Sequence, residues 1–95
     1  MNQLVEYYSK SVNFLNVSGA EYLELLYIRN AIGLVEQEFT KEQRKALLQA
    51  DKKLIDNAFR VYEELNRFLD LKEYRKAHSI PKERWWWYLD EKDKP

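Results

Sequence analysis

Residues 19–43 read GAEYLELLYIRNAIGLVEQEFTKEQ, and this stretch decides the fold. Its apolar side chains recur every three or four positions, which is the period of an α-helix. We predict a helix over about 19–38, preceded by a capping box that begins at Ser18. A second capping box, formed by Thr40 and Gln43, is expected to turn the chain tightly into the next helix. The two helices would then form an antiparallel hairpin.

The predicted helix over 19–38 carries more apolar surface than a one-sided amphipathic helix needs. Besides its main stripe it has a second one, which consists of Leu23, Tyr27 and Leu34. Such a helix is either the central helix of a bundle or is covered on its far side by another subunit. The surplus favours a homodimer over a monomer. Asn30 lies amid these apolar residues, either buried to fix register or exposed at the helix edge.

Two further helices are expected on either side of this one. The first covers about 2–15, where Leu4, Tyr8 and Val12 share one face. The third covers about 41–69, where a heptad seam alternates steps of four and three. The members of that seam are Leu47, Leu54, Ala58, Val61, Leu65 and Phe68.

The helical pattern loses its phase after Asp70. Leu71 and Tyr74 would fall on the polar face of a continued helix, so a break is expected. Asp70 can cap a short separate helix over about 71–77, with a continuous third helix as the rival interpretation. Pro81 is then expected in the first turn of a last short helical segment, and the charged residues 90–95 as a frayed tail.

Composition limits the class of protein. The 95 residues are enough for one domain, spanning 1–95. Only two glycines and two prolines occur, as in helical proteins, and the absence of cysteine excludes disulfides and thiolate sites. Together with the lack of an evident signal peptide or membrane span, this predicts a cytoplasmic protein. The charges balance overall, although residues 1–40 are net acidic and 41–80 net basic.

The most distinctive motif is the aromatic run Trp85, Trp86, Trp87 and Tyr88. On a helix, three consecutive tryptophans point about 100° apart, so they cannot all enter one core. One interpretation is that two of them fold back with Leu89 over the helical hairpin as core residues. The other is that one or two are exposed anchors for a protein partner, since tryptophan and tyrosine are enriched at binding hot spots. Both can hold for different rings.

Basic residues surround this aromatic run, which raises nucleic-acid binding by the segment 72–88 as an alternative function. Phosphates would meet the charges, and bases would stack on the rings. The candidate residues are Lys72, Arg75, Lys76, Lys82 and Arg84. Acidic neighbours such as Glu73 and Glu83 dilute this charge, which favours a solvated surface instead.

Catalytic chemistry has little support in the sequence. His78 is the only histidine and has no nucleophile or carboxylate at a diagnostic spacing, so a surface or capping role is expected. Glu21, Glu24, Glu36 and Glu38 lack the Glu-x-x-His pairs of di-iron bundles, so no metal, cofactor or small-molecule substrate is expected.

Taken together, the sequence predicts an all-α bundle of three main helices with one or two short C-terminal helical segments. We expect a non-enzymatic protein–protein interaction module, such as a small regulatory or inhibitor subunit, that forms a homodimer. Its anchors would come from the aromatic run over 85–88 together with Tyr27 and Leu34.

Overall fold

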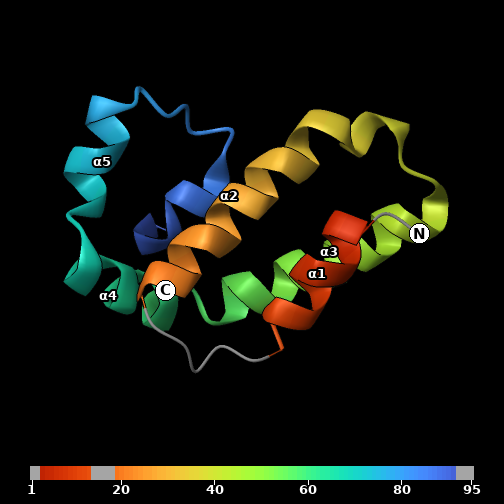
Figure 1. Ribbon diagram of the computed structural model, residues 1–95, viewed down its shortest axis with the longest axis horizontal. Coiled ribbons are helices and arrows are strands. Elements are labelled where there is room, and N and C mark those ends of the chain that lie inside the picture. Colours follow the sequence, from red (N-terminus) through yellow and green to blue (C-terminus); the bar gives the residue numbers. More distant parts are fainter. Residues whose placement is uncertain (1–2, 14–18, 92–95) are drawn as a thin grey trace.

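The computed structural model describes residues 3–13 and 19–91, and every regular element in those ranges is helical (Figure 1). The all-α prediction is therefore confirmed for this part of the chain. None of the described helices has the length and apolarity required to cross a membrane. The elements are α1 (Gln3–Ser11), α2 (Gly19–Val35), η1 (Glu36–Glu38), α3 (Lys41–Asp56), α4 (Ala58–Phe68), α5 (Leu71–Ala77), η2 (Trp85–Trp87) and η3 (Leu89–Glu91).

The first two helices are shorter than expected. α1 ends at Ser11 rather than near 15, and the predicted cap at Ser18 lies outside the described residues. α2 begins at Gly19 as predicted, but the chain tightens after Val35 into the 3₁₀ turn η1. Such tightening is common at helix ends, where the last carbonyls have no α-helical partner.

α2 is the central helix of the fold. It packs against α1, α4 and the 3₁₀ turn η2. Part of the additional apolar surface of α2 is thereby buried within one chain, namely Tyr22 and Leu26, whereas Tyr27 and Leu34 of the second stripe are exposed. α2 is therefore the central helix, and cover of the second stripe by another subunit stays a prediction.

The turn between α2 and α3 is a complete capping box, as predicted. Thr40 Oγ1 accepts from the Gln43 backbone N–H at 3.2 Å, and Gln43 Oε1 accepts from the Thr40 N–H at 2.9 Å. The returning chain nevertheless lies along α2 through α4 rather than α3. α1 packs against both α2 and α3, and Arg29 of α2 reaches α3 directly through two hydrogen bonds to Asp51.

The expected continuous helix over 41–69 is wrong, because the chain breaks into α3 and α4 at Asn57. Asn57 leaves the helical conformation at φ −112° and ψ 18°, and its side-chain amide donates to the Lys53 carbonyl at 2.8 Å. Asparagine favours such local bonds over the helix interior. The heptad seam survives the break, since its members from Leu47 to Leu65 are buried, but Phe68 is 55% exposed.

The break at Asp70 is present, so the rival of a continuous helix is wrong. Asp70 Oδ1 accepts from the Glu73 backbone N–H at 3.2 Å and caps α5. Pro81, in contrast, begins a turn closed by the Arg84 N–H rather than a helix, and helical structure resumes only at η2.

The predicted frayed tail is ordered at its start. Asp90 and Glu91 belong to η3, and Asp90 pairs with Arg75 through two hydrogen bonds. The turn η3 is ordered because the ion pair between Asp90 and Arg75 anchors it to α5. Residues 92–95 lie outside the described part of the chain.

Candidate interaction surface

The amide of Asn30 on α2 holds two of the three tryptophans. Its Oδ1 accepts from Trp86 Nε1 at 2.7 Å and from Trp87 Nε1 at 2.9 Å. One oxygen thus satisfies two buried indole N–H groups, whose desolvation would otherwise destabilise the fold. Of the two interpretations of Asn30, the structure supports a polar residue that fixes the packing register.

Arg29, one residue earlier, links this segment to the core. Its guanidinium carbon lies 4.4 Å from the centre of the Trp86 ring, a cation–π contact. Arg29 also donates two hydrogen bonds to Asp51 on α3, and Asp51 Oδ1 accepts from the Tyr8 hydroxyl of α1 at 2.6 Å. Burial, and then the negative charge of Asp51, raise the pKa of Tyr8. One polar network therefore joins α1, α2 and α3 beneath the tryptophans.

The C-terminal segment is fastened to α5 as well. Arg75 Nη1 donates to Asp90 Oδ1 at 2.6 Å and to the Trp87 carbonyl at 3.1 Å, and its guanidinium carbon lies 4.5 Å from the centre of the Tyr88 ring. Burial alone would raise the pKa of Asp90, but the hydrogen bonds and charge of Arg75 outweigh it and lower that pKa. Tyr88 adds a bond from its hydroxyl to the Ile80 carbonyl.

These contacts decide the role of the aromatic run. Trp86 is 5% and Trp87 1% exposed, so both are core residues, packed with Leu89. The prediction that they are exposed anchors is wrong, because their faces and N–H groups are already used inside the chain. Trp85 and Tyr88 are half-buried at the edge of the same cluster.

The basic residues proposed for nucleic acid differ in their exposure and partners. Arg75 is withdrawn into its pair with Asp90, while Lys72, Lys76 and Arg84 are exposed. Lys82 is exposed too, 3.7 Å from the carboxylate of Glu91. The withdrawal of Arg75 removes a central cation from the predicted set.

His78 has the surface and capping role that was expected. It is exposed, forms the C-cap of α5, and its ring centre lies 4.1 Å from that of Tyr74. The described residues also contain no group of three or more metal-ligating side chains placed to hold an ion.

Two predicted contact residues, Tyr27 and Leu34, remain on the surface at 47% and 80% exposure. Both lie on one face of α2, where the ring of Tyr27 packs edge-on against the buried Trp87 with ring centres 5.5 Å apart. With their neighbours on that face they form what we call the outer stripe: Ala20, Leu23, Tyr27, Ala31 and Leu34. Ala20 is exposed, and Leu23 and Ala31 are half-buried. The five side chains include no charge, so the stripe is a continuous apolar strip.

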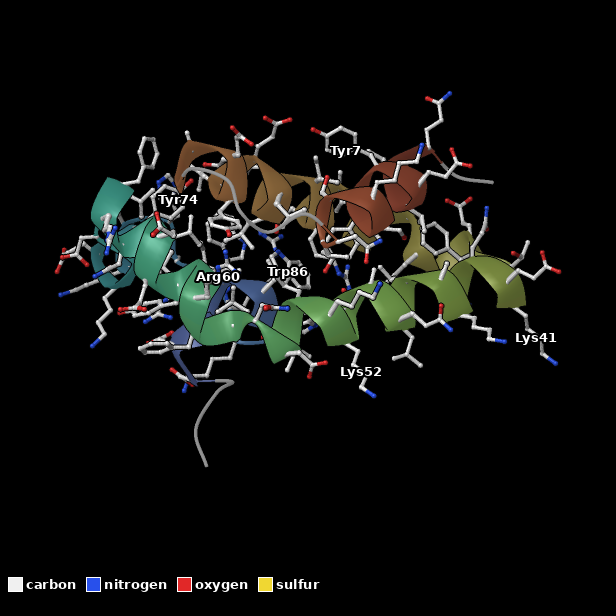
Figure 2. All side chains as sticks on the ribbon, turned by 90° about the horizontal axis from the view of Figure 1, so that it is seen from below. Tyr7, Lys41, Lys52, Arg60, Tyr74 and Trp86 are labelled. Carbon is white, nitrogen blue, oxygen red and sulfur yellow. The ribbon has the colours of Figure 1, made fainter. Side chains whose placement is uncertain are left out.

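Side chains from α1 and α5 border the outer stripe. On one side the Tyr7 hydroxyl donates to Glu24 Oε1 at 3.2 Å, and this bond, followed by the charge of Glu24, raises the pKa of Tyr7. On the other side the hydroxyls of Tyr27 and Tyr74 are hydrogen-bonded, and Tyr74 stacks on Trp87 with ring centres 5.2 Å apart. Figure 2 shows Tyr7 on the side of the molecule formed by α1 and α2, with Lys41 and Lys52 on the opposite side.

Other exposed apolar side chains lie in more polar surroundings. Phe59 on α4 lines a hollow with Tyr62, Glu63, Asn66 and Arg67, and the 55% exposed Phe68 directly follows Arg67 at the end of the same helix. Leu48 on α3 is 71% exposed, and both of its chain neighbours one turn away, Arg44 and Lys52, are exposed and basic. The outer stripe is therefore the strongest candidate for an apolar contact surface.

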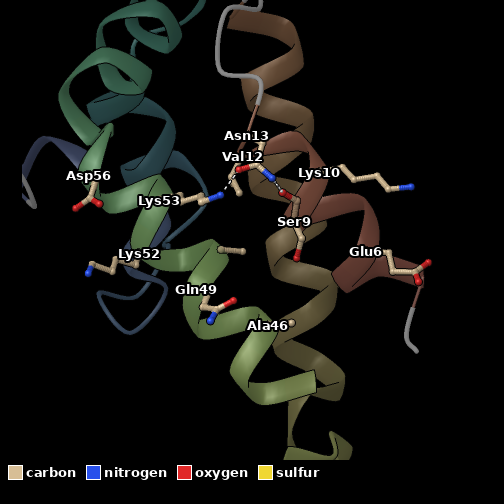
Figure 3. A pocket seen from close by; sticks show the side chains of 11 residues that line it. Glu6, Ser9, Lys10, Val12, Asn13, Ala46, Gln49, Lys52, Lys53 and Asp56 are labelled. Carbon is tan, nitrogen blue, oxygen red and sulfur yellow. Dashed lines mark hydrogen bonds between the residues drawn. The ribbon is translucent and has the colours of Figure 1, made fainter. Parts of the chain in front are cut away.

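A groove of about 650 Å³ between α1 and α3 was not foreseen from the sequence (Figure 3). Its floor consists of Val12, Ala46 and Ala50, and these small side chains leave the space open. Basic and acidic groups alternate on its rim, with Lys10, Lys52 and Lys53 beside Glu6 and Asp56. Because the rim carries both signs of charge, it favours neither an anionic nor a cationic ligand.

No protein family, curated protein or solved structure matches this chain.

Proposed function

We propose that this chain is a non-enzymatic protein–protein interaction module, of the kind used as a small regulatory or inhibitor subunit, and that it binds through the outer stripe of α2. The supporting observation is the 80% exposure of Leu34 on the same uncharged strip as Tyr27. An apolar strip on the central helix of a fold is typical of a contact surface. Tyrosine adds contact area at low cost in side-chain entropy.

The partner we propose is a second copy of the chain. The outer stripe is apolar along its length, so it matches itself without a complementary charge. Each copy already has a closed core beneath the stripe, with Leu26, Ile32 and Trp87 fully buried. The copies would therefore fold separately and associate reversibly. One helix face is a small interface, so we expect a dissociation constant roughly in the micromolar range.

Sedimentation velocity over a wide range of protein concentrations tests this proposal. The weight-average mass should rise toward that of a dimer, and Leu34→Lys should abolish the rise because it places a charge in the apolar strip. Leu48→Lys is the matched control, since Leu48 is similarly exposed but lies on α3. It should leave the association unchanged.

Circular dichroism of both variants should show unaltered helical content, because neither side chain is in the core. A wild-type chain that stays monomeric at every concentration would contradict the proposal. So would a dimer that Leu48→Lys disrupts and Leu34→Lys does not.

A further inference from the structure

We infer that two copies pair through their α2 helices in antiparallel orientation, with Tyr27 at the twofold axis and Leu34 of one copy beside Ala20 of the other. This inference rests on the proposed function and specifies its geometry. It follows from how large and small side chains are placed along the outer stripe.

The residues of the outer stripe are spaced evenly on either side of Tyr27. At each spacing a small side chain on one side of Tyr27 corresponds to a large one on the other. Ala20 and Leu34 each lie seven residues from Tyr27, and Leu23 and Ala31 each lie four residues from it. In an antiparallel pair centred on Tyr27, residues equidistant from the centre reach the same height along the helix axis. Each leucine then meets an alanine of the second copy. The twofold axis makes the Ala20–Leu34 contact and the Leu23–Ala31 contact each occur twice. A large side chain therefore meets a small one at four heights along the helix pair.

A parallel pair lacks this complementarity. It would set Leu34 against Leu34 and Ala20 against Ala20, which crowds one level and leaves another hollow. Overfilled and underfilled contacts both destabilise a packed interface. The order of residue sizes along the stripe therefore favours the antiparallel arrangement.

The spacing also suits a helix pair over its full length. Ala20, Tyr27 and Leu34 are a heptad apart, so they stay on one seam when two helices cross at a shallow angle. From Ala20 to Leu34 the seam is about 21 Å long at 1.5 Å per residue. Each alanine leaves room for the leucine of the second copy at its level.

Polar groups beside the seam are held by contacts within the same copy. The Glu24 carboxylate accepts from Tyr7 on α1. The Asn30 carbonyl oxygen accepts from the indoles of Trp86 and Trp87, and the Trp87 ring packs edge-on against Tyr27. The Tyr27 hydroxyl is held by Tyr74 of α5. The central tyrosine is thus fixed before association, which reduces the entropy lost on binding.

Disulfide trapping tests the arrangement cleanly, because the chain has no cysteine. Ala20→Cys and Leu34→Cys are prepared separately, one of them with a mass tag, then mixed and oxidised. We expect the mixed disulfide to exceed either self-linked product several-fold. In the antiparallel pair two copies of residue 20 lie about 21 Å apart along the axis. A disulfide requires Cα atoms within about 7 Å. Tyr27→Cys should link to itself.

The outcomes separate this inference from the proposed function. Sedimentation first establishes that each variant still associates. Self-linking of Ala20→Cys and of Leu34→Cys without the mixed product would indicate a parallel pair, which overturns the inference and leaves the interaction module in place. Monomers that form no disulfide above the level of a Leu48→Cys control would overturn both.

Discussion

Arg29 and Asp51 form a two-point ion pair across the core, with Nε to Oδ1 at 3.0 Å and Nη2 to Oδ2 at 3.1 Å. Arg29 is only 4% exposed. Asp51→Ala should lower the free energy of unfolding by about 3 kcal/mol, since removing one partner of a buried pair leaves the other charge uncompensated. The remaining carboxylate, Glu36, lies 3.8 Å from Nη1 and can replace only part of the contact. Urea unfolding followed by circular dichroism measures the loss.

The exposed pair between Glu64 and Arg67 provides the control, with its closest atoms 3.4 Å apart. Arg67→Ala should cost less than about 1 kcal/mol, because solvent screens an exposed pair. Equal losses for Asp51→Ala and Arg67→Ala would show that the buried pair has no special role.

Tyr8 makes the free energy of unfolding depend on pH in the alkaline range. Burial raises the pKa of Tyr8 above the ordinary tyrosine value of about 10, so above that pH the unfolded phenol loses its proton while the folded one keeps it. The unfolded state then binds fewer protons, and stability falls as pH rises. At neutral pH, Tyr8→Phe should cost about 2 kcal/mol, the value of a hydrogen bond to a charged group.

The stability difference between wild type and Tyr8→Phe should therefore shrink above pH 10. Unfolding of wild type and of Tyr8→Phe, measured at pH 7 and at several higher pH values, tests this. A difference that stays constant across this range would mean that the folded Tyr8 ionises like a free tyrosine.

Replacing Asn30 should release the two indole N–H groups that share its oxygen. Asn30→Leu leaves both donors unsatisfied in the core, and we expect a loss of about 2 to 4 kcal/mol. Tryptophan fluorescence during urea unfolding reports on these rings directly. Asn30→Asp keeps an acceptor oxygen at the same position and should be less destabilising. If the leucine variant is as stable as wild type, the shared oxygen does not hold the segment.

The two glycines should respond to alanine with opposite signs. At Gly19 an added Cβ would lie 2.7 Å from the Glu64 carbonyl oxygen and 2.7 Å from Phe68 Cβ, so Gly19→Ala should cost about 1 to 3 kcal/mol. At Gly33 the nearest atom is 3.6 Å away, on Trp86. Gly33→Ala should stabilise α2 by about 0.5 to 1 kcal/mol. Thermal unfolding of both variants measures the contrast, and a shift in the same direction would refute it.

Local signals in the sequence were sufficient for much of the fold. The caps at Thr40 and Asp70 act within three residues, so their side chains alone predict where α3 and α5 begin. The heptad seam from Leu47 to Leu65 is similarly local, because one helix period fixes which side chains share a face.

Contacts between residues far apart in the sequence could not be predicted from those local signals. The partnership of Asn30 with two tryptophans spans more than fifty residues, and its polar amide gave equal support to burial and exposure. The break at Asn57 was missed because the apolar period continues through it, although an Asp-Asn pair of weak helix formers marks the position. The pairing of Arg75 with Asp90 likewise depended on how the last turns fold back.

The dependence of the core on Trp86, Trp87 and Leu89 also bears on synthesis. A nascent chain that has emerged only as far as α5 has no indoles for Asn30 and no carboxylate for Arg75. The polar network on α2 would stay open to water until these late residues leave the ribosome. Folding should accordingly be completed only after α1 to α5 have been translated and residues 86–90 have followed.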